Sequence, residues 1–404
     1  AVVPAPRTLF RGAQKLPPAH WMRICSKSGQ IHAQKYWEAK YERQELHSNW
    51  QESDWEDAIL EALRKAVKRR LVADVQVGVF LSGGLDSSLI TALIHEQHPD
   101  QLQTFSVGFE GAGGEHGNEF QYSDVVAERF SSQHHRIEVS SKQLLNNLPH
   151  LFDGMSEPMV SHDNIGFFLL SKESAKHVKV VQSGQGADEV FAGYKWYPPM
   201  LETSEPLQSY VNQFFDRSFE DMKQILCPEW AHEDYALEFV RNQFSEPGAQ
   251  TGLDKALRLD TNVMLVEDPV KRVDNNTMAW GLEARVPFLD HELVELAAAM
   301  PGELKALDGG KALLKKIGRK MIPREVIDRP KGYFPVPELK YIQGPFLDFV
   351  KDVFASQSAR HRGLFQRHEI EKWMQNSKDH ITPLGGSKLW QVTAIEYWLQ
   401  RNGL

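Results

Sequence analysis

The sequence places a glycine-rich turn directly after a short β-branched run, and it does so twice. Residues 75–81 (VQVGVFL) are followed by SGGLDSS, and residues 178–182 (VKVVQ) are followed by SGQGADE. Strand-like and helix-like stretches alternate around these runs, which is typical of a parallel sheet covered by helices on both faces. Because such sheets bind ligands at the carboxyl ends of their strands, both turns are expected at one binding edge.

The periodicity predicts an α/β fold with a parallel doubly wound sheet and a mostly helical C-terminal half. Strands are expected over residues 75–81, 102–109, 135–139 and 178–182. The first helix is expected to follow a capping box formed by Ser53 and Glu56. Later helices of the first half are expected over residues 89–94, 122–130 and 167–176. After Tyr194 the strand signal fades, and helices are expected over residues 210–219, 235–244, 293–300, 311–321 and 389–400.

The composition excludes several classes of protein. The chain has 404 residues, enough for two to three domains, and 46 Lys and Arg against 54 Asp and Glu give a net charge of −8. This charge disfavours attachment to nucleic acid or anionic membranes. The two cysteines, Cys25 and Cys227, form neither a disulfide framework nor a zinc motif. We therefore expect a cytoplasmic protein that acts on small molecules and binds no nucleic acid or membrane.

The first turn has the chemistry of a phosphate site. Gly83 and Gly84 let the backbone approach a ligand, and the N–H groups of the turn and the following helix converge on one spot. Asp86 is suited to hold a Mg²⁺ that arrives with a polyphosphate. Hydroxyl donors are supplied by Ser82, Ser87 and Ser88. The turn is not a Walker A loop, since no lysine lies beside the serines, and the alternative is an ordinary strand–turn–helix connection.

Five motifs, in order along the chain, resemble the PP-loop ATP-pyrophosphatases, and among them the synthetase domain of the asparagine synthetase family. They are VGVFLSGGLDSSLITALI, TFSVGF (Thr104–Phe109), SGQGADEVFAGY (Ser183–Tyr194), KRVDNNTMAWGLEARVPFLD (Lys271–Asp290) and RPKGYF (Arg329–Phe334). The resemblance implies a PP-loop type sheet and an ATP that is cleaved to AMP and pyrophosphate. A carboxylate is then activated as an adenylate, and ammonia attacks it to form an amide.

The resemblance also implies roles for individual residues. Asp86 and Asp188 would bind Mg²⁺ on the pyrophosphate, and Lys331 would add a positive charge there. Adenine and ribose would be held by Leu81, Val107, Ser183 and Gly184. Candidate substrate contacts are Gln185, Glu189, Glu157, His162 and Asp163. Lys311 is expected at a helix start beside the site, with contact to phosphate left open, and Arg285 and Asp290 are interpreted as a structural ion pair.

Two positions depart from glutamine-dependent asparagine synthetases. The family glutamate of SGEG is Gln185 here, and an amide neither accepts a proton nor pairs with an α-ammonium group. A basic family position holds Asn275. Segments GNEFQYSD, MSEPMVSHD, WYPP and TPLGGSKLWQ instead resemble N-acetylglutaminylglutamine amidotransferases. That branch amidates the C-terminal carboxylate of an acylated dipeptide to make an osmoprotectant, so its substrate has no free α-ammonium.

Residues 6–24 resemble the tail of a glutaminase domain where it joins a synthetase. We therefore expect residues 1–52 to be that tail and a linker, 53–345 the synthetase domain, and 346–404 a helical extension. Ammonia would come from a glutaminase domain absent from this chain, and a homodimer is left open. The alternatives are an asparagine synthase acting on aspartate, an inactive nucleotide-binding scaffold, and a tRNA sulfur transferase, for which persulfide cysteines and a basic face are lacking.

Overall fold

The computed structural model describes residues 2–100, 102–329 and 336–404. Its central sheet has five parallel strands in the order β5-β4-β3-β6-β7. Their bounds are β3 Val77–Phe80, β4 Gln103–Phe109, β5 Gln133–Val139, β6 Val180–Gln182 and β7 Glu283–Arg285. The first four confirm the predicted strands. The expectation that strands end before Tyr194 is wrong, because β7 is too short and too polar to show a strand pattern.

Strand β3 lies in the middle of the sheet, between β4 and β6. The chain runs from β3 through β4 to β5 on one side and then returns to β6 and β7 on the other. Val79 of β3 pairs with Gln182 at the end of β6, so the carboxyl ends of these two strands are adjacent. This is the point where the strand order reverses, which is where open α/β sheets bind their ligands.

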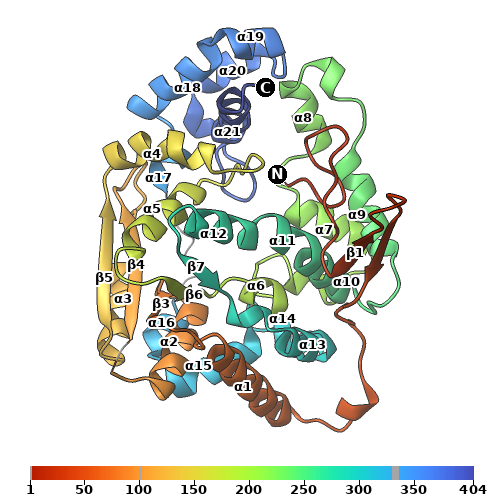
Figure 1. The fold of residues 1–404 in the computed structure, drawn as a ribbon, viewed down its shortest axis with the longest axis vertical. Helices are drawn as coiled ribbons and strands as arrows, with labels where there is room; N and C mark the ends of the chain where they lie inside the picture. Colours follow the sequence, from red (N-terminus) through yellow and green to blue (C-terminus); the bar gives the residue numbers. More distant parts are fainter. Residues whose placement is uncertain (1, 101, 330–335) are drawn as a thin grey trace.

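Helices cover both faces of the sheet, as predicted. Val79 packs into an apolar core with α1 (Glu52–Arg69), α2 (Leu85–Gln97) and α15 (Ala312–Met321). The next residue, Phe80, points to the opposite face, where α5 (Asn164–Ser174) and α12 (Pro269–Met278) pack. Figure 1 shows these two groups of helices on either side of the strands.

Helices dominate the second half of the chain, as predicted. The remaining helices are α3 Phe120–Arg129, α4 Ser141–Asp153, α6 Ala187–Val190, α7 Pro206–Phe214, α8 Phe219–Ile225, α9 Tyr235–Ser245, α10 Gly252–Leu259, α11 Leu265–Glu267, α13 His291–Ala299, α14 Gly302–Ala306, α16 Arg324–Ile327, α17 Pro337–Lys340, α18 Pro345–Ala355, α19 Gln357–Arg362, α20 Arg367–Gln375 and α21 Lys388–Arg401. Helices α18, α20 and α21 share one apolar core with α4 and α5. None of the described helices has the length and apolar character needed to cross a membrane.

Two local predictions of helix boundaries are wrong. The capping box of α1 is formed by Gln51 and Asp54, each two positions before the residue that was expected, and the Gln51 N–H donates to Asp54 Oδ2 at 2.7 Å. The helix expected over residues 210–219 is interrupted, because α7 ends at Phe214 and Ser218 caps a new helix, α8. In both cases a nearby polar side chain captures the backbone N–H groups first.

The N-terminal residues form an antiparallel hairpin, β1 (His20–Ile24) with β2 (Ile31–Lys35). Ion pairs made by Lys15, which precedes the hairpin, connect the N-terminal residues to the rest of the molecule. The ammonium of Lys15 lies 2.7 Å from Glu157 and 2.7 Å from Glu267, two carboxylates that are almost completely buried. This contact joins the N-terminal segment to the helical half of the chain.

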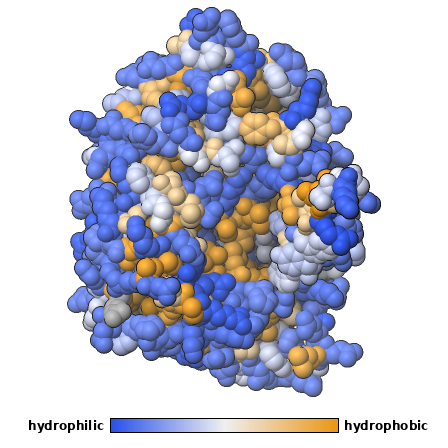
Figure 2. Space-filling model, viewed as in Figure 1, coloured by the Kyte–Doolittle hydropathy of each residue, from blue (hydrophilic) through white to orange (hydrophobic). Residues whose placement is uncertain are grey.

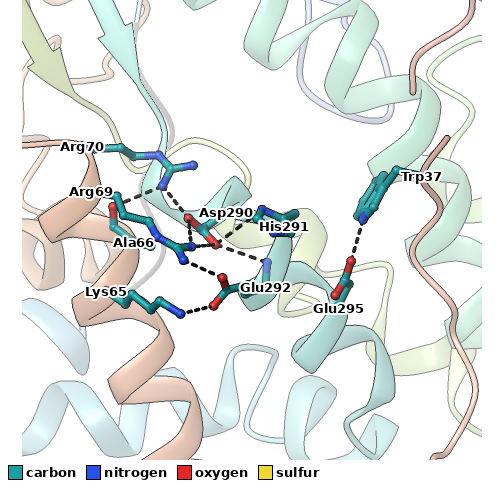
Figure 3. Close-up of polar contacts among 9 residues, drawn as sticks. All are labelled: Trp37, Lys65, Ala66, Arg69, Arg70, Asp290, His291, Glu292 and Glu295. Carbon is teal, nitrogen blue, oxygen red and sulfur yellow. Dashed lines mark hydrogen bonds and ion pairs between the residues drawn. The ribbon is translucent and has the colours of Figure 1, made fainter. Parts of the chain in front are cut away.

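The predicted ion pair between Arg285 and Asp290 is wrong. Asp290 accepts instead from Arg69 at 3.1 Å and from Arg70 at 2.8 Å, which pins the start of α13 to the end of α1 (Figure 3). Arg285 pairs with Glu283 at 2.7 Å and donates to the carbonyl oxygen of Arg70 at 2.9 Å. Both residues hold the loop after β7, as a structural role requires, but through different partners.

Candidate active site

The first turn connects β3 to α2 and is closed by its own hydroxyl groups. The Ser82 N–H donates to Ser87 Oγ at 3.2 Å, and the Gly84 N–H donates to Ser82 Oγ at 3.3 Å. Gly84 is the N-cap residue of α2, so the free N–H groups of that helix begin directly after the turn. An anion at this position would meet both backbone donors and the positive end of a helix dipole.

The second turn connects β6 to α6 and lies against the first. At Gly184 a β-carbon would lie 3.0 Å from Asp86 Cβ and 3.1 Å from the Ser87 backbone nitrogen. A β-carbon here would be in tight contact with the first turn, so the absence of a side chain at Gly184 helps the two turns to approach each other. The expectation that both glycine-rich turns share one edge of the sheet is confirmed.

A cavity of about 540 Å³ opens over the two turns. Among the predicted site residues, it is lined by Leu81, Ser82, Gly84, Asp86, Ser87, Val107, Asp163, Ser183, Gly184, Gln185 and Asp188. Lys331 lies outside the described residues. Figure 2 shows an apolar hollow bordered by hydrophilic residues near the middle of this face, between the positions that α12 and α6 occupy in Figure 1.

Other predicted site residues do not line the cavity. Gly83 lies behind the turn, and Ser88 is buried inside α2. Glu157 is held in the ionic cluster with Lys15 and with Lys271, whose ammonium is 2.6 Å away. His162 also lies outside the lining, and its burial lowers the pKa of its imidazole. A direct contact of these four residues with a ligand would require a change in their surroundings.

Lys311 joins the two aspartates that were expected to bind metal. Its Nζ lies 2.6 Å from Asp86 Oδ2 and 2.8 Å from Asp188 Oδ1. Burial alone would lower the pKa of Lys311, but Asp188 and Asp86 outweigh this effect and raise the pKa above its ordinary value. Lys311 therefore carries a permanent positive charge beside the first turn. The backbone N–H of Lys311 donates to the Phe191 carbonyl at 3.1 Å, which fixes its position near α6.

Asp86 and Asp188 also fit Mg²⁺. Magnesium in nucleotide sites is held by one or two carboxylates together with the phosphates of the ligand. Both side chains are about one-fifth exposed toward the cavity and offer oxygen donors. Within the part of the chain that the structure describes, no cluster of three or more metal-ligating side chains occurs. The donor set therefore suits a metal that arrives with phosphate rather than one held by the protein alone.

Gly193 packs tightly against the same cluster. A β-carbon at this position would lie 2.1 Å from Asp188 Oδ1 and 2.3 Å from Lys311 Cε. These distances are far below any real contact, so a larger residue would displace the carboxylate or the lysine. The glycine is therefore required by the geometry of the charged cluster.

Glu189, a predicted substrate contact, lies beneath the cavity rather than in its lining. It is almost completely buried, and its Oε1 accepts from the Tyr194 hydroxyl at 2.8 Å. Burial, together with the neighbouring charge of Asp188, raises the pKa of Glu189 to about 7. Tyr194 does line the cavity, so Glu189 is connected to the site by its hydrogen bond to this tyrosine.

Arg272 is a cavity residue that the sequence did not single out for a role. Its Nη1 lies 2.9 Å from Asp163 Oδ1 and 3.3 Å from Asp268 Oδ1, and its Cζ lies 5.7 Å from the centre of the Phe167 ring. Only 7% of its surface is exposed. Its place in the KRVDNN motif on α12 could have marked Arg272 as a site residue. Its partner Asp163 could not be identified in this way, because it is 109 positions away along the chain.

The comparison with known families decides the assignment. The sequence matches the asparagine synthase family over residues 58–400, which is most of the chain. The chain belongs to the asparagine synthase family. The resemblance seen in the five motifs is therefore confirmed at the level of the family, and so is the parallel α/β sheet expected for its PP-loop fold.

Relatives in this family are distant and longer. Glutamine-hydrolyzing asparagine synthetase 1 of Bacillus subtilis is 27% identical over 436 aligned residues, covering 98% of this chain and 66% of that protein. A putative glutamine-hydrolyzing asparagine synthetase of Mycobacterium bovis is 28% identical, covering 89% and 60%. The chain thus spans less than two thirds of the length of these relatives.

Among solved structures, the U34-tRNA thiolase NcsA of Methanococcus maripaludis is 13% identical, covers 94% of this chain and 97% of that chain, and has a TM-score of 0.33.

Proposed function

We propose that this protein is an ATP-dependent amide synthetase, a carbon–nitrogen ligase that forms AMP. The observation that carries the proposal is the cluster of Lys311 with Asp86 and Asp188 beside the first turn, inside a cavity large enough for a nucleotide and a small acceptor. In the proposed reaction, an oxygen of the acceptor carboxylate attacks the α-phosphorus of ATP. The bond to the β-phosphate breaks, and pyrophosphate leaves.

The residues around the first turn would stabilise the leaving pyrophosphate. Backbone N–H groups at the start of α2 would donate to the phosphates, and so would the hydroxyl groups of Ser82 and Ser87, which contact each other at 3.1 Å. Asp86 and Asp188 would hold Mg²⁺, which when bound neutralises the charge that develops on the leaving group. Lys311 adds a fixed positive charge at the same place. The family role of Lys331 on the pyrophosphate remains a prediction.

The acceptor is proposed to be the C-terminal carboxylate of N-acetylglutaminylglutamine. Gln185, which lines the cavity, is neutral and cannot pair with an α-ammonium group. Asp163 is already neutralised by Arg272. The cavity therefore favours an acceptor without a free amine, and the guanidinium of Arg272 is placed to attract its carboxylate.

Aspartate is the alternative acceptor, which would make the protein an asparagine synthase. The observation that keeps it open is Asp308, an exposed carboxylate at the rim of the same cavity. Its oxygens could pair with the α-ammonium of aspartate in place of the missing glutamate. An Asp308→Asn variant separates the two cases, because only the reaction with aspartate should lose apparent affinity for the acceptor.

Ammonia is proposed to come from glutamine, released by a glutaminase domain that precedes this part of the polypeptide. The support is the printed name of the relatives, which are glutamine-hydrolyzing, and the resemblance of residues 6–24 to the tail of such a domain. An enzyme that consumes ATP and glutamine in this way is expected in the cytoplasm.

The proposal is tested by supplying ATP, Mg²⁺ and ammonium with either aspartate or N-acetylglutaminylglutamine. We expect stoichiometric AMP, pyrophosphate and the amidated dipeptide, identified by mass. With ¹⁸O in the acceptor carboxylate, one labelled oxygen should appear in AMP, because the adenylate intermediate transfers it. Release of ADP, or AMP without label, would contradict the mechanism. Binding of ATP without turnover of either acceptor would support the inactive scaffold.

The role of Gln185 has its own test. Gln185→Glu adds a negative charge beside Gly184 and Asp188, where the carboxylate of the dipeptide would approach. We expect amidation of the dipeptide to fall while no asparagine is formed. Unchanged amidation would remove Gln185 from the acceptor site.

A further inference from the structure

Arg329 lies at the first turn and lines the same cavity as Lys311 with its aspartates. It is the last described residue before the gap at residues 330–335, and its side chain is only 8% exposed. A β-carbon at Gly84 would lie 3.7 Å from Arg329 Nη2, so the guanidinium borders the turn itself. Arg329, Gly84 and Glu119 all line the cavity.

Two residues at the start of α3 hold the guanidinium in place. Its Nη1 donates to Glu119 Oε1 at 2.9 Å and its Nη2 to Glu119 Oε2 at 3.3 Å, while its Cζ lies 4.1 Å from the centre of the Tyr122 ring. A bidentate carboxylate and an aromatic face together fix both the position and the plane of an arginine. Glu119 and Tyr122 belong to the segment GNEFQYSD, whose Phe120 and Ser123 also line the cavity.

The charge of the cavity argues that this arginine serves a ligand. In the described lining, five carboxylates (Asp86, Glu119, Asp163, Asp188 and Asp308) face four cations (Arg272, Lys311, Lys315 and Arg329). An ATP molecule adds about four further negative charges at neutral pH, so the cations must be shared with its phosphates. Arg329 can do so, because two of its five N–H donors satisfy Glu119 and the others remain for a second anion.

We propose that Arg329 binds the phosphates of ATP that leave as pyrophosphate, and that Glu119 and Tyr122 are positioning residues that hold its guanidinium at the first turn. The proposal rests on the proposed function. In the absence of phosphate, Glu119 balances the buried charge. When the polyphosphate binds, Arg329 bridges Glu119 and the phosphate, so Glu119 both orients the guanidinium and competes for it.

A purely structural ion pair would behave differently. If the ion pair of Arg329 with Glu119 only held α3 against the segment after α16, then substitution of either residue would have the same effect on ligand affinity. If Arg329 binds phosphate, substitutions of Arg329 and of Glu119 should change the affinity for phosphate in opposite directions. Arg329→Gln removes the cation, whereas Glu119→Gln keeps an acceptor for the guanidinium and removes the competing negative charge.

The experiment measures the dissociation constants of MgATP, magnesium pyrophosphate and AMP by calorimetry for the wild-type protein and the variants R329Q, R329K and E119Q. The matched control is R401Q, since Arg401 also pairs with an aspartate, Asp153, through two nitrogens on the exposed end of α21. Thermal unfolding of each variant checks that it is folded.

For R329Q we expect MgATP and pyrophosphate to bind at least tenfold more weakly, with AMP affinity within twofold of wild type. E119Q should bind pyrophosphate more tightly than wild type, R329K should recover part of the loss, and R401Q should match wild type. In turnover, R329Q should raise KM for ATP while KM for the acceptor stays the same. Equal weakening of ATP and AMP in both R329Q and E119Q, or unchanged ATP binding in R329Q, would overturn the inference.

The two proposals fail in different ways. If the wild-type protein binds no MgATP, the proposed function falls and the role of Arg329 falls with it. If wild type binds and turns over ATP but R329Q does not discriminate between ATP and AMP, only the role of Arg329 is refuted.

Discussion

The ammonium of Lys311 bridges Asp86 and Asp188, and the effect of its removal should be measurable without substrate. Lys311→Met keeps the length and apolar stem of the side chain but leaves two partly buried carboxylates without their shared cation, at a site where Nζ lies 2.6 and 2.8 Å from their oxygens. Removing one partner of such a pair typically costs about 3–5 kcal/mol. We expect the free energy of unfolding of Lys311→Met to be lower than that of wild type by this amount near pH 8.

Magnesium should reverse part of this loss. With the ammonium gone, the two carboxylates form a stronger cation site, and binding to the folded state alone stabilises it by mass action. If the dissociation constant is about 1 mM, then 10 mM Mg²⁺ stabilises the variant by about 1.4 kcal/mol, which corresponds to a few degrees in Tm. The wild-type protein should respond much less, because Lys311 already balances both aspartates.

The assay is thermal unfolding at pH 8, with Mg²⁺ or with the same ionic strength of Na⁺. The control is Lys316→Met on the same helix, because Lys316 pairs with Glu52 at the surface and such a pair contributes about 0–1 kcal/mol. A Lys311→Met protein as stable as the control would refute the reasoning. So would equal stabilisation of wild type and variant by Mg²⁺.

Three further substitutions follow from the same geometry. Gly193→Ala should lower the rate of pyrophosphate release at least tenfold, because the new β-carbon would lie 2.1 Å from Asp188 Oδ1; a rate near wild type would contradict the packing. Burial raises the pKa of Asp260 to about 7, above its value of about 3.9 in unfolded chains. The stability that this proton provides is present below pH 4 and lost as the pH rises through 7. In urea unfolding, the free energy of unfolding of Asp260→Asn should therefore rise by up to about 4 kcal/mol relative to that of wild type between pH 4 and 8. A difference between the two proteins that does not change with pH would refute this. Asp290→Ala should cost about 2 kcal/mol in the same assay, since it removes an N-cap and the partner of two arginines, and a cost below about 0.5 kcal/mol would show that the contact is not stabilising.

The sequence predicted the sheet edge of the site well because that edge is encoded locally. A β-branched run, a glycine-rich turn and a helix start occupy about a dozen consecutive residues, and the two such segments became neighbours because β3 and β6 pair in the sheet. Strand β7 was not predicted, because its three residues are too few to show the alternation of apolar and polar side chains that identifies a strand. The capping box of α1 was misplaced because Ser53 and Glu56 have the same spacing as Gln51 and its true partner Asp54.

The charged partners in the cavity could not be predicted in this way. Lys311 is 225 positions from Asp86, and Arg272 is 109 positions from Asp163. Ion pairs over such separations depend on how helices of the second half pack over the sheet, and no local pattern encodes that packing. The interpretation of Arg285 and Asp290 failed for the same reason, because α1 supplies the arginines that reach Asp290.

The ion pairs of the cavity carboxylates give an argument about the acceptor, aspartate or an acylated dipeptide, that is separate from the argument based on Gln185. Asp86 and Asp188 share Lys311, Asp163 is paired with Arg272, and Glu119 is paired with Arg329. The amine of aspartate would have to share one of these carboxylates with the cation already paired to it, which lowers the gain from the new contact. Asp308 at the rim escapes this cost but offers an exposed and therefore weak contact. An acylated dipeptide has no amine that competes for these carboxylates, because its amide groups need only hydrogen bonds. The pairing of the carboxylates therefore favours an acceptor without a free amine, independently of the glutamine in the second turn.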